Sequence, residues 1–231
     1  MKKPYVICHM LCSIDGKVTG EFLKNNSSID GSYVYYEINR NYKADAFVCG
    51  RITMQESFTG DYYPDLINFE PVLENDDYVA STNNYYAISF DPKGKVGWKT
   101  SKIIDPDEDP GYHNAHIIEV VTENVNRKYL SYLKSIGVSY IFGGKEKINV
   151  IDTLMKLNKL FSINVILLEG GSVINGTFIY EDAIDELSLV ISPVTSLSSD
   201  KSLFNESVIT KFKLNEIKRY DNDIIWLNYK K

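Results

Sequence analysis

Short apolar runs that alternate with helix-forming segments constrain the fold of this 231-residue chain most strongly. Each run has about four to eight residues, the length of a buried strand, and stops at a glycine or a polar turn. The expected strands cover residues 5–12, 44–49, 85–90, 117–121, 138–142, 165–168 and 187–191. Strands that alternate with helices form a largely parallel sheet covered by helices. The pattern therefore predicts an α/β fold.

The segments between these runs carry helix signals, and the end of the chain changes to a strand pattern. The expected helices cover residues 31–41, 51–58, 126–136, 149–160 and 172–180. Asn149 is a suitable helix cap, and Gly137 suits a left-handed helix stop. Residues 212–217 and 224–229 alternate around a polar turn, which indicates a hairpin. We expect one domain over residues 1–231, with a mixed, mostly parallel central sheet flanked by helices and a C-terminal antiparallel hairpin.

Two segments have neither pattern. Residues 18–30 are expected to form a loop, and residues 59–84 a long irregular segment, polar and aromatic with two prolines. A long loop inside a compact domain is often a binding element.

Charge and cysteine content exclude several classes of function. The chain has 25 basic and 31 acidic residues, so its formal charge of −6 argues against nucleic acid or an anionic membrane as partner. No apolar run reaches the roughly 18–20 residues of a membrane helix. Three cysteines, an odd number in apolar stretches, do not suggest disulfides and fit a reducing cytoplasm. His113 and His116 are expected to be loop histidines in water and not a metal site.

Polar and glycine-rich motifs follow four of the expected strands. They are Ser13-Ile14-Asp15-Gly16-Lys17, Gly50-Arg51-Ile52-Thr53, Gly143-Gly144-Lys145 and Glu169-Gly170-Gly171-Ser172. Ligands of open α/β sheets bind beyond the carboxyl ends of the strands. These motifs are therefore the candidate site for a small-molecule ligand.

The segment from Gly50 to Thr53 joins a buried strand to a helix. The N–H groups and the positive dipole at a helix start bind phosphate, and Arg51 and Thr53 can add side-chain contacts. Arg51 is also one of only four arginines among the 25 basic residues. The alternative is a surface arginine beside a turn glycine.

Glu169, Gly170 and Gly171 also join a strand to a helix. Paired glycines let the backbone approach a diphosphate closely, and a carboxylate at the end of an apolar strand is unusual. A plain glycine turn with Glu169 in solvent remains the alternative. For Ser13 and Asp15 the alternative is an ordinary Asp-Gly turn.

Taken together, these motifs resemble the dihydrofolate-reductase-like superfamily. They are more closely similar to the reductase domain of riboflavin biosynthesis, the 5-amino-6-(5-phosphoribosylamino)uracil reductase family. The matches occur in the family's order between residue 5 and about residue 204. They are Ser13-Ile14-Asp15-Gly16-Lys17, Gly50-Arg51-Ile52-Thr53, Leu167-Leu168-Glu169-Gly170-Gly171 with Asn175 and Phe178, and Asp185-Glu186-Leu187 with Pro193.

The resemblance implies NADPH as cofactor, a homodimer, and hydride transfer to the ribosyl C1′ of an aminopyrimidine. The residues that would bind the NADPH phosphates are Gly50, Arg51, Thr53, Gly170, Gly171 and Ser172. Ser13, Asp15 and Glu169 would face nicotinamide and substrate. Asp15 and Glu169 are the expected catalytic residues, since either can assist proton movement. Asp91 ends the third expected strand, and a carboxylate near the cofactor's 2′-position would disfavour the 2′-phosphate, so the choice between NADPH and NADH stays open.

The chain departs from the family's pattern at its expected substrate contacts. His9 stands where the family commonly has a lysine, and Asp61 begins only part of the family's Asp-x-Pro-x-Leu-Thr-x-Arg segment, without the arginine. His9 and Asp61 are kept as expected substrate contacts. The pocket is expected to be more aromatic than in the family, with tyrosines able to stack on a flat heterocycle. They are Tyr62, Tyr63, Tyr85 and Tyr86.

The sequence leaves three functions open. The first is a stand-alone NADPH-dependent reductase of a pyrimidine- or pterin-like substrate, since the motifs of the family's zinc deaminase domain do not occur. The second is a non-catalytic nucleotide-binding module. The third is a true dihydrofolate reductase.

Overall fold

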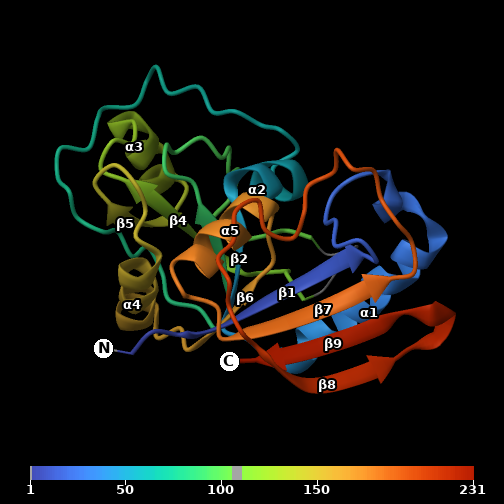
Figure 1. Ribbon diagram of the computed structural model, residues 1–231. Coiled ribbons are helices and arrows are strands. Elements are labelled where there is room, and N and C mark those ends of the chain that lie inside the picture. Colours follow the sequence, from blue (N-terminus) through green and yellow to red (C-terminus); the bar gives the residue numbers. More distant parts are fainter. Residues whose placement is uncertain (1, 106–110) are drawn as a thin grey trace. The chain divides into compact units, whose positions relative to one another are not determined.

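The structure is a computed structural model, which describes residues 2–105 and 111–231 (Figure 1). The chain divides into two compact units. Unit 1 comprises Met1–Pro4 and Asp45–Asn164, and unit 2 comprises Tyr5–Ala44 and Val165–Lys231. The expectation of a single domain over residues 1–231 stays a prediction.

Unit 1 is a parallel sheet with helical connections. Its strands, in the spatial order β5-β4-β3-β2, are Ser139–Gly144, His116–Thr122, Tyr86–Phe90 and Ala46–Gly50. Its helices are α2 (Arg51–Phe58), α3 (Arg127–Ser135) and α4 (Val150–Phe161). Buried aromatic side chains, among them Phe47, Trp98 and Tyr129, fill its core. Because Gly50 lies opposite Phe90, the carboxyl ends of β2 and β3 are level with each other.

Unit 2 combines parallel strands with the terminal hairpin. Its strands, in the order β6-β1-β7-β9-β8, are Val165–Leu168, Tyr5–Ser13, Glu186–Ser192, Ile225–Lys230 and Lys213–Arg219. Strands β6, β1 and β7 are parallel to one another, and β9 is antiparallel to both of its neighbours, β7 and β8. Its helices are α1 (Asn26–Tyr42) and α5 (Ser172–Tyr180), with short 3-10 turns at Glu21–Lys24 and Asp221–Asp223. Helix α1 covers one face of β1 and β7 (Figure 1).

These elements confirm the predicted α/β class, the mostly parallel strands and the C-terminal antiparallel hairpin. The predicted cap and stop are also present, since the Asn149 side chain accepts the N–H of Asp152 and Gly137 has φ +72°. The long segment over residues 59–84 is irregular as predicted, apart from an isolated bridge between Tyr78 and Tyr140.

Three expectations are wrong. The expected loop over residues 18–30 contains the 3-10 turn Glu21–Lys24 and the start of α1. Helix α1 begins at Asn26, five residues before the predicted start, because Asn25 caps it by accepting the N–H of Ser27 at 3.0 Å. His116 is the first residue of β4 and 1% exposed, not a loop histidine in water. Its Nε2 contacts the Ser139 hydroxyl at 2.8 Å, and burial lowers its pKa to about 4.

Membrane-spanning helices, metal ligands and disulfides were the remaining features considered from the sequence. Within them, no helix is both long and apolar enough to cross a membrane. No three histidine, cysteine, aspartate or glutamate side chains gather as metal ligands within residues 2–105 and 111–231. Cys8, Cys12 and Cys49 are buried, and none of the three is in a disulfide among the described residues.

Candidate active site

The helices of the described residues begin in two different ways. Helices α1, α3 and α4 each follow an asparagine whose side chain accepts a first-turn N–H. Helices α2 and α5 follow Gly50 and Gly171, which supply no such acceptor. The first N–H groups of a helix lack partners within the helix, so an uncapped start can bind an anion. Among the α-helices of the described chain, the two uncapped starts are the two motifs that the sequence assigns to phosphate.

In unit 2, strand β6 ends at Leu168 and Glu169-Gly170-Gly171 leads into α5. Gly170 has φ +98°, and a Cβ there would lie 3.0 Å from Met10 Cε, so the position favours glycine. The Gly170–Gly171 peptide bond is cis. The close approach of this backbone to a diphosphate stays a prediction.

The first turn of α5 contains buried polar atoms without partners. Ser172 is 3% exposed, and its Oγ has no hydrogen-bond partner among the described residues. Asn175 is fully buried; its Nδ2 donates to the Leu203 carbonyl, whereas no described residue donates a hydrogen bond to its Oδ1. Buried polar groups are nearly always paired, and exceptions need an explanation. The Ser172 hydroxyl is therefore free to donate to an anion at this uncapped helix start.

Glu169 is held by a residue far away in the sequence. Asn39 on α1 donates from Nδ2 to Glu169 Oε1, and Asn39 is 6% exposed. This contact joins residues 130 positions apart, so no sequence spacing could have revealed it. Asn39 fixes the carboxylate that the sequence identifies as a catalytic candidate. Sequence reasoning missed it, since a polar residue within an amphipathic helix carries no specific signal.

The turn after β1 places the Ser13 hydroxyl against the Asp15 carboxylate. Ser13 Oγ donates to Asp15 Oδ1 at 2.7 Å and accepts the N–H of Lys17 at 2.9 Å. The N–H of Ser196 also donates to Asp15 Oδ1, at 3.0 Å. These hydrogen bonds, first that of Ser13, lower the pKa of the exposed Asp15 carboxyl. Asp15 is therefore ionised at neutral pH and can accept, but not supply, a proton there.

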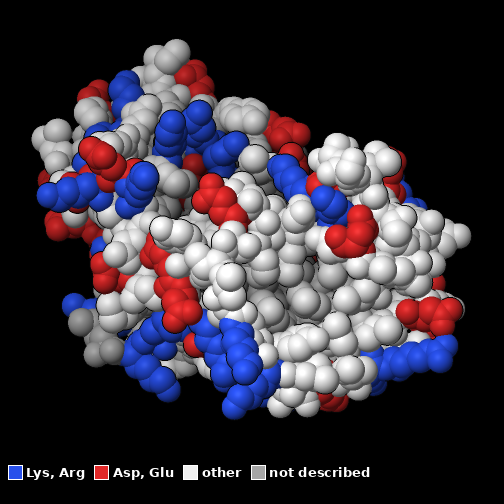
Figure 2. Space-filling model, in the orientation of Figure 1, with Lys and Arg blue, Asp and Glu red and all other residues white. Residues whose placement is uncertain are grey.

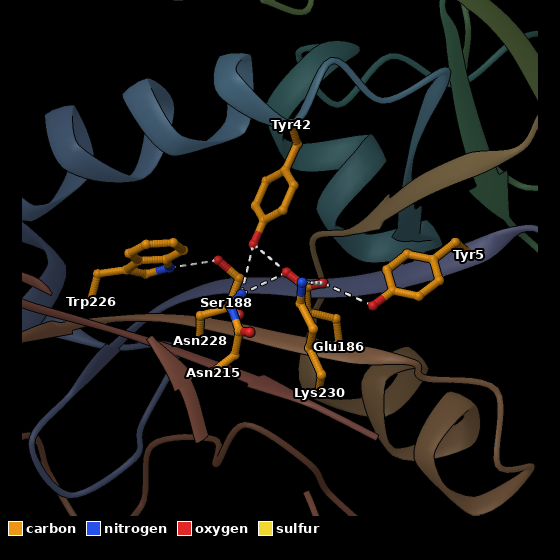
Figure 3. A network of polar contacts seen from close by, with 8 residues as sticks. All are labelled: Tyr5, Tyr42, Glu186, Ser188, Asn215, Trp226, Asn228 and Lys230. Atoms are coloured by element: carbon orange, nitrogen blue, oxygen red, sulfur yellow. Dashed lines mark hydrogen bonds and ion pairs between the residues drawn. The ribbon is translucent and has the colours of Figure 1, made fainter. Parts of the chain in front are cut away.

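His9 lies on the face of β1 that α1 covers, and it is fully buried. Its ring stacks on Tyr35 with centroids 4.1 Å apart. Nε2 lies 2.9 Å from the Tyr35 carbonyl, and Nδ1 lies 3.2 Å from the Ser188 carbonyl and 2.9 Å from the Ser188 hydroxyl. Both carbonyls only accept, so either ring nitrogen can carry the single proton of the neutral ring. Trp226 Nε1 donates to the same Ser188 hydroxyl at 2.8 Å (Figure 3).

Burial lowers the pKa of His9 to about 4, so the ring is neutral at physiological pH. It does not supply the positive charge of the lysine that the family commonly has there. Both ring nitrogens are occupied by groups of unit 2 itself. A substrate contact for His9 stays a prediction.

In unit 1, Arg51 begins α2 and is partly exposed, as is Thr53. Asp91 follows β3 and is fully buried; its Oδ2 accepts the N–H groups of Lys95 and Val96. Burial raises the pKa of Asp91, against the opposing effects of these N–H groups and of the Arg51 charge. Asp91 thus stabilises the loop that follows β3, a role that the sequence did not suggest.

Asp61 and the four tyrosines occupy different environments within unit 1. Asp61 is exposed in the loop after α2 with φ +54°. Tyr62 and Tyr63 are also exposed, at 39% and 63%. Tyr86 is buried against Phe161, and Tyr85 packs on Phe47. Tyr86 therefore packs in the interior of unit 1, Tyr85 is half-buried against Phe47, and Tyr62 and Tyr63 remain candidates for stacking.

Comparison with known proteins places the chain in a family. It matches the model of the family described as the RibD C-terminal domain over residues 4–226. A pyrimidine reductase-like protein from Corynebacterium diphtheriae has a similar structure, with 18% identity, a TM-score of 0.66, and coverage of 98% of this chain and 91% of that chain.

Two further structures share the fold. RibD from Acinetobacter baumannii has 19% identity and a TM-score of 0.65 over 99% of this chain, which spans 58% of that chain. The riboflavin biosynthesis reductase Rib7 of Saccharomyces cerevisiae has 14% identity and a TM-score of 0.65, covering 99% of this chain and 90% of that chain. Identities this low show the fold, whereas the family match extends over most of the sequence. The chain belongs to the RibD C-terminal domain family.

Proposed function

We propose that the chain is an NADPH-dependent reductase that transfers a hydride to a pyrimidine- or pterin-like substrate. The family membership supports this proposal, as do the names of similar proteins, a pyrimidine reductase-like protein and a riboflavin biosynthesis reductase. The observation that carries it is the pair of uncapped helix starts at Gly50 and Gly171, the second beside the unpaired Ser172 hydroxyl. Both positions were assigned to cofactor phosphates from sequence.

NADPH, when bound, supplies the hydride, and the residues of the chain supply binding and orientation. Gly50, Arg51 and Thr53 would contact phosphate through N–H groups, a guanidinium and a hydroxyl. Gly170 and Gly171 would offer backbone N–H groups to phosphate, and Ser172 would donate its hydroxyl.

The two catalytic candidates have different roles in this proposal. Asp15 is ionised because Ser13 and the Ser196 N–H donate to it, so it would orient a substrate hydroxyl or a water by accepting a hydrogen bond. Glu169, held by Asn39, would stand beside the reacting groups and accept or return a proton.

Replacing Arg51 tests the phosphate contact. Arg51→Ala should weaken NADPH binding by about 10- to 100-fold, since a hydrogen bond to a charged group contributes about 1.5–3 kcal/mol. Calorimetric titration measures the affinity. Arg219→Ala is the matched control, because Arg219 pairs with Asp223 on the surface of unit 2 and should leave affinity unchanged. A wild-type chain that binds no NADPH contradicts the proposal.

A non-catalytic nucleotide-binding module is the second candidate. The neutral state of buried His9 favours it, because a positive charge expected at the substrate is missing there. NADPH binding without NADPH oxidation across pyrimidines, pterins and flavins would support this alternative. Turnover of dihydrofolate that methotrexate inhibits would instead indicate a dihydrofolate reductase.

A further inference from the structure

Two loops of unit 2 that lie far apart in the sequence contact each other beyond the carboxyl ends of β1 and β7. One covers residues 14–20 and follows β1, and the other covers residues 193–203 and follows β7. We call them the first loop and the second loop. Figure 1 shows them side by side. The first loop carries Asp15, one of the two catalytic candidates.

Backbone hydrogen bonds join the two loops along their length. The N–H of Ile14 donates to the Val194 carbonyl at 2.9 Å, and the N–H of Val18 donates to the Lys201 carbonyl at the same distance. In the other direction, the N–H of Leu203 donates to the Gly16 carbonyl at 3.0 Å. The second loop therefore supports the first loop at three separate points.

Asp200 stabilises a turn within the second loop. One oxygen of its carboxylate, Oδ2, accepts from the Ser196 hydroxyl at 2.5 Å and from the N–H of Leu197 at 3.1 Å. The N–H of Asp200 itself donates to the Leu197 carbonyl at 3.0 Å. Asp200 therefore holds Ser196 both through the Ser196 side chain and through the peptide group that follows it.

The first loop in turn holds Asp200 in place. Gly20 has φ +113°, and a Cβ on it would clash with Asp200 Oδ2, so glycine is needed there for the carboxylate to fit. The Lys17 ammonium donates to the Asp200 carbonyl at 3.0 Å. In Figure 2, acidic and basic groups lie next to each other on the part of the surface that the two loops form. Asp200 is thus fixed by a backbone and a side chain of the first loop.

We propose that Asp200 is a positioning residue for the Asp15 carboxylate and that it acts through Ser196. The inference rests on the proposed function, in which Asp15 accepts a hydrogen bond from a substrate hydroxyl or a water. Ser196 is the link, because its N–H donates to Asp15 Oδ1 at 3.0 Å while its hydroxyl donates to Asp200. Without Asp200, Ser196 is free to turn, and its N–H then leaves the Asp15 carboxylate.

The bonds to Asp15 determine which of its oxygens is left for a ligand. The Ser13 hydroxyl and the Ser196 N–H both donate to Oδ1, so Oδ2 is the oxygen that neither donor uses. Asp15 is exposed, and with Ser13 alone its carboxylate could rotate about a single hydrogen bond. Donors from two different loops fix the carboxylate, and a group that orients a substrate needs such a fixed direction.

A carbon-13 NMR titration of the Asp15 carboxyl tests the inference without any measurement of activity. Asp200→Ala removes the acceptor of the Ser196 hydroxyl, whereas Asp200→Asn removes the same charge and keeps an oxygen that can accept. The pKa of Asp15 should therefore be higher in Asp200→Ala than in Asp200→Asn, because only the alanine variant loses the Ser196 N–H that stabilises the ionised form. Asp182→Asn removes a surface ion pair before β7 and should leave the pKa of Asp15 unchanged.

Steady-state kinetics with 5-amino-6-(5-phosphoribosylamino)uracil as the probe gives a second readout. Asp200→Ala should lower kcat about tenfold with the KM for NADPH unchanged, and Asp200→Asn should restore kcat, since one hydrogen bond to a charged group is at stake. A wild-type chain that does not oxidise NADPH with this probe speaks against the proposed function and not against the inference, which the titration decides.

Two results would overturn the inference. One is an equal pKa of Asp15 in Asp200→Ala and Asp200→Asn. The other is an equal loss of kcat in both variants, which would show that the charge of Asp200 matters and its hydrogen bonds do not. If circular dichroism shows that Asp200→Ala does not fold, Ser196→Ala takes its place, because it deletes only the hydroxyl that Asp200 binds. Ser196→Ala should raise the pKa of Asp15 above that of the wild type, and an unchanged pKa would overturn the inference as well.

Discussion

Acidification should destabilise the protein through His9, a buried neutral histidine. Its pKa falls from 6.5 in the unfolded chain to about 4 in the folded one, because burial disfavours the charged ring. The hydrogen bonds that the Tyr35 and Ser188 carbonyls accept from the ring, and the charge of Glu186, oppose this effect only in part. Between these two pKa values the unfolded chain binds more protons than the folded one. The contribution of His9 to the free energy of unfolding is therefore fully present above pH 6.5 and is lost as the pH falls toward 4.

The magnitude follows from the two pKa values. Between pH 7 and pH 5, the His9 contribution to the free energy of unfolding should fall by about 2 kcal/mol. Other groups also titrate in this range, so the quantity to compare is the fall in the wild type against the fall in His9→Gln. The glutamine amide can still donate to the Tyr35 carbonyl but does not titrate. Each protein is compared with itself, so a constant effect of the substitution cancels.

Urea unfolding at the two pH values provides the free energies. His116, whose pKa is also about 4, offers an independent replicate, and His116→Gln should reduce the fall by a similar amount. The reasoning is refuted if His9→Gln loses as much stability as the wild type between pH 7 and pH 5. A ring resonance of His9 that titrates near 6.5 in the folded protein would refute it as well.

Two further substitutions test the packing of unit 2. Glu186→Ala leaves the donors of Tyr42 and Asn228 without their carboxylate and should lower the free energy of unfolding by about 3–5 kcal/mol. Tyr5→Phe removes one hydrogen bond at an exposed ring and should lower it by about 1 kcal/mol. Similar losses for both variants in urea unfolding would contradict the central role of Glu186. Gly170→Ala should cost about 1–3 kcal/mol and weaken NADPH binding, because alanine strains φ +98° and its Cβ meets Met10. Gly16 has φ +76° and open space around its Cα, so Gly16→Ala should lose only the stability that the backbone strain costs. An equal loss of stability at both glycines, with NADPH affinity unchanged, would contradict the role of Gly170.

Elements with a local signal were predicted well from the sequence. The strand that ends at Leu168 is a continuous apolar run closed by Glu169 and two glycines, and the structure has it at Val165–Leu168. The α4 start follows the local chemistry of Asn149, whose side chain caps the helix. By contrast, α1 begins earlier than its apolar spacing suggests, because the Asn25 cap includes a polar first turn in the helix.

The site was predictable where it depends on backbone and not where it depends on distant contacts. The uncapped starts at Gly50 and Gly171 follow from glycine at the end of an apolar run. The Asn39–Glu169 bond and the neutral state of His9 depend on which side chains the fold brings together. Likewise, no sequence pattern indicates that Asp91 Oδ2 accepts N–H groups of its own loop, and the position of Asp91 relative to the cofactor stays a prediction.

A crystal structure of the chain with NADPH tests the central claim most directly. The account predicts phosphate oxygens at the N–H groups that begin α2 and α5, with the Arg51 guanidinium and the Ser172 hydroxyl within hydrogen-bond distance of them. A bound dinucleotide whose phosphates contact neither helix start, with Ser172 still unpaired, would contradict it.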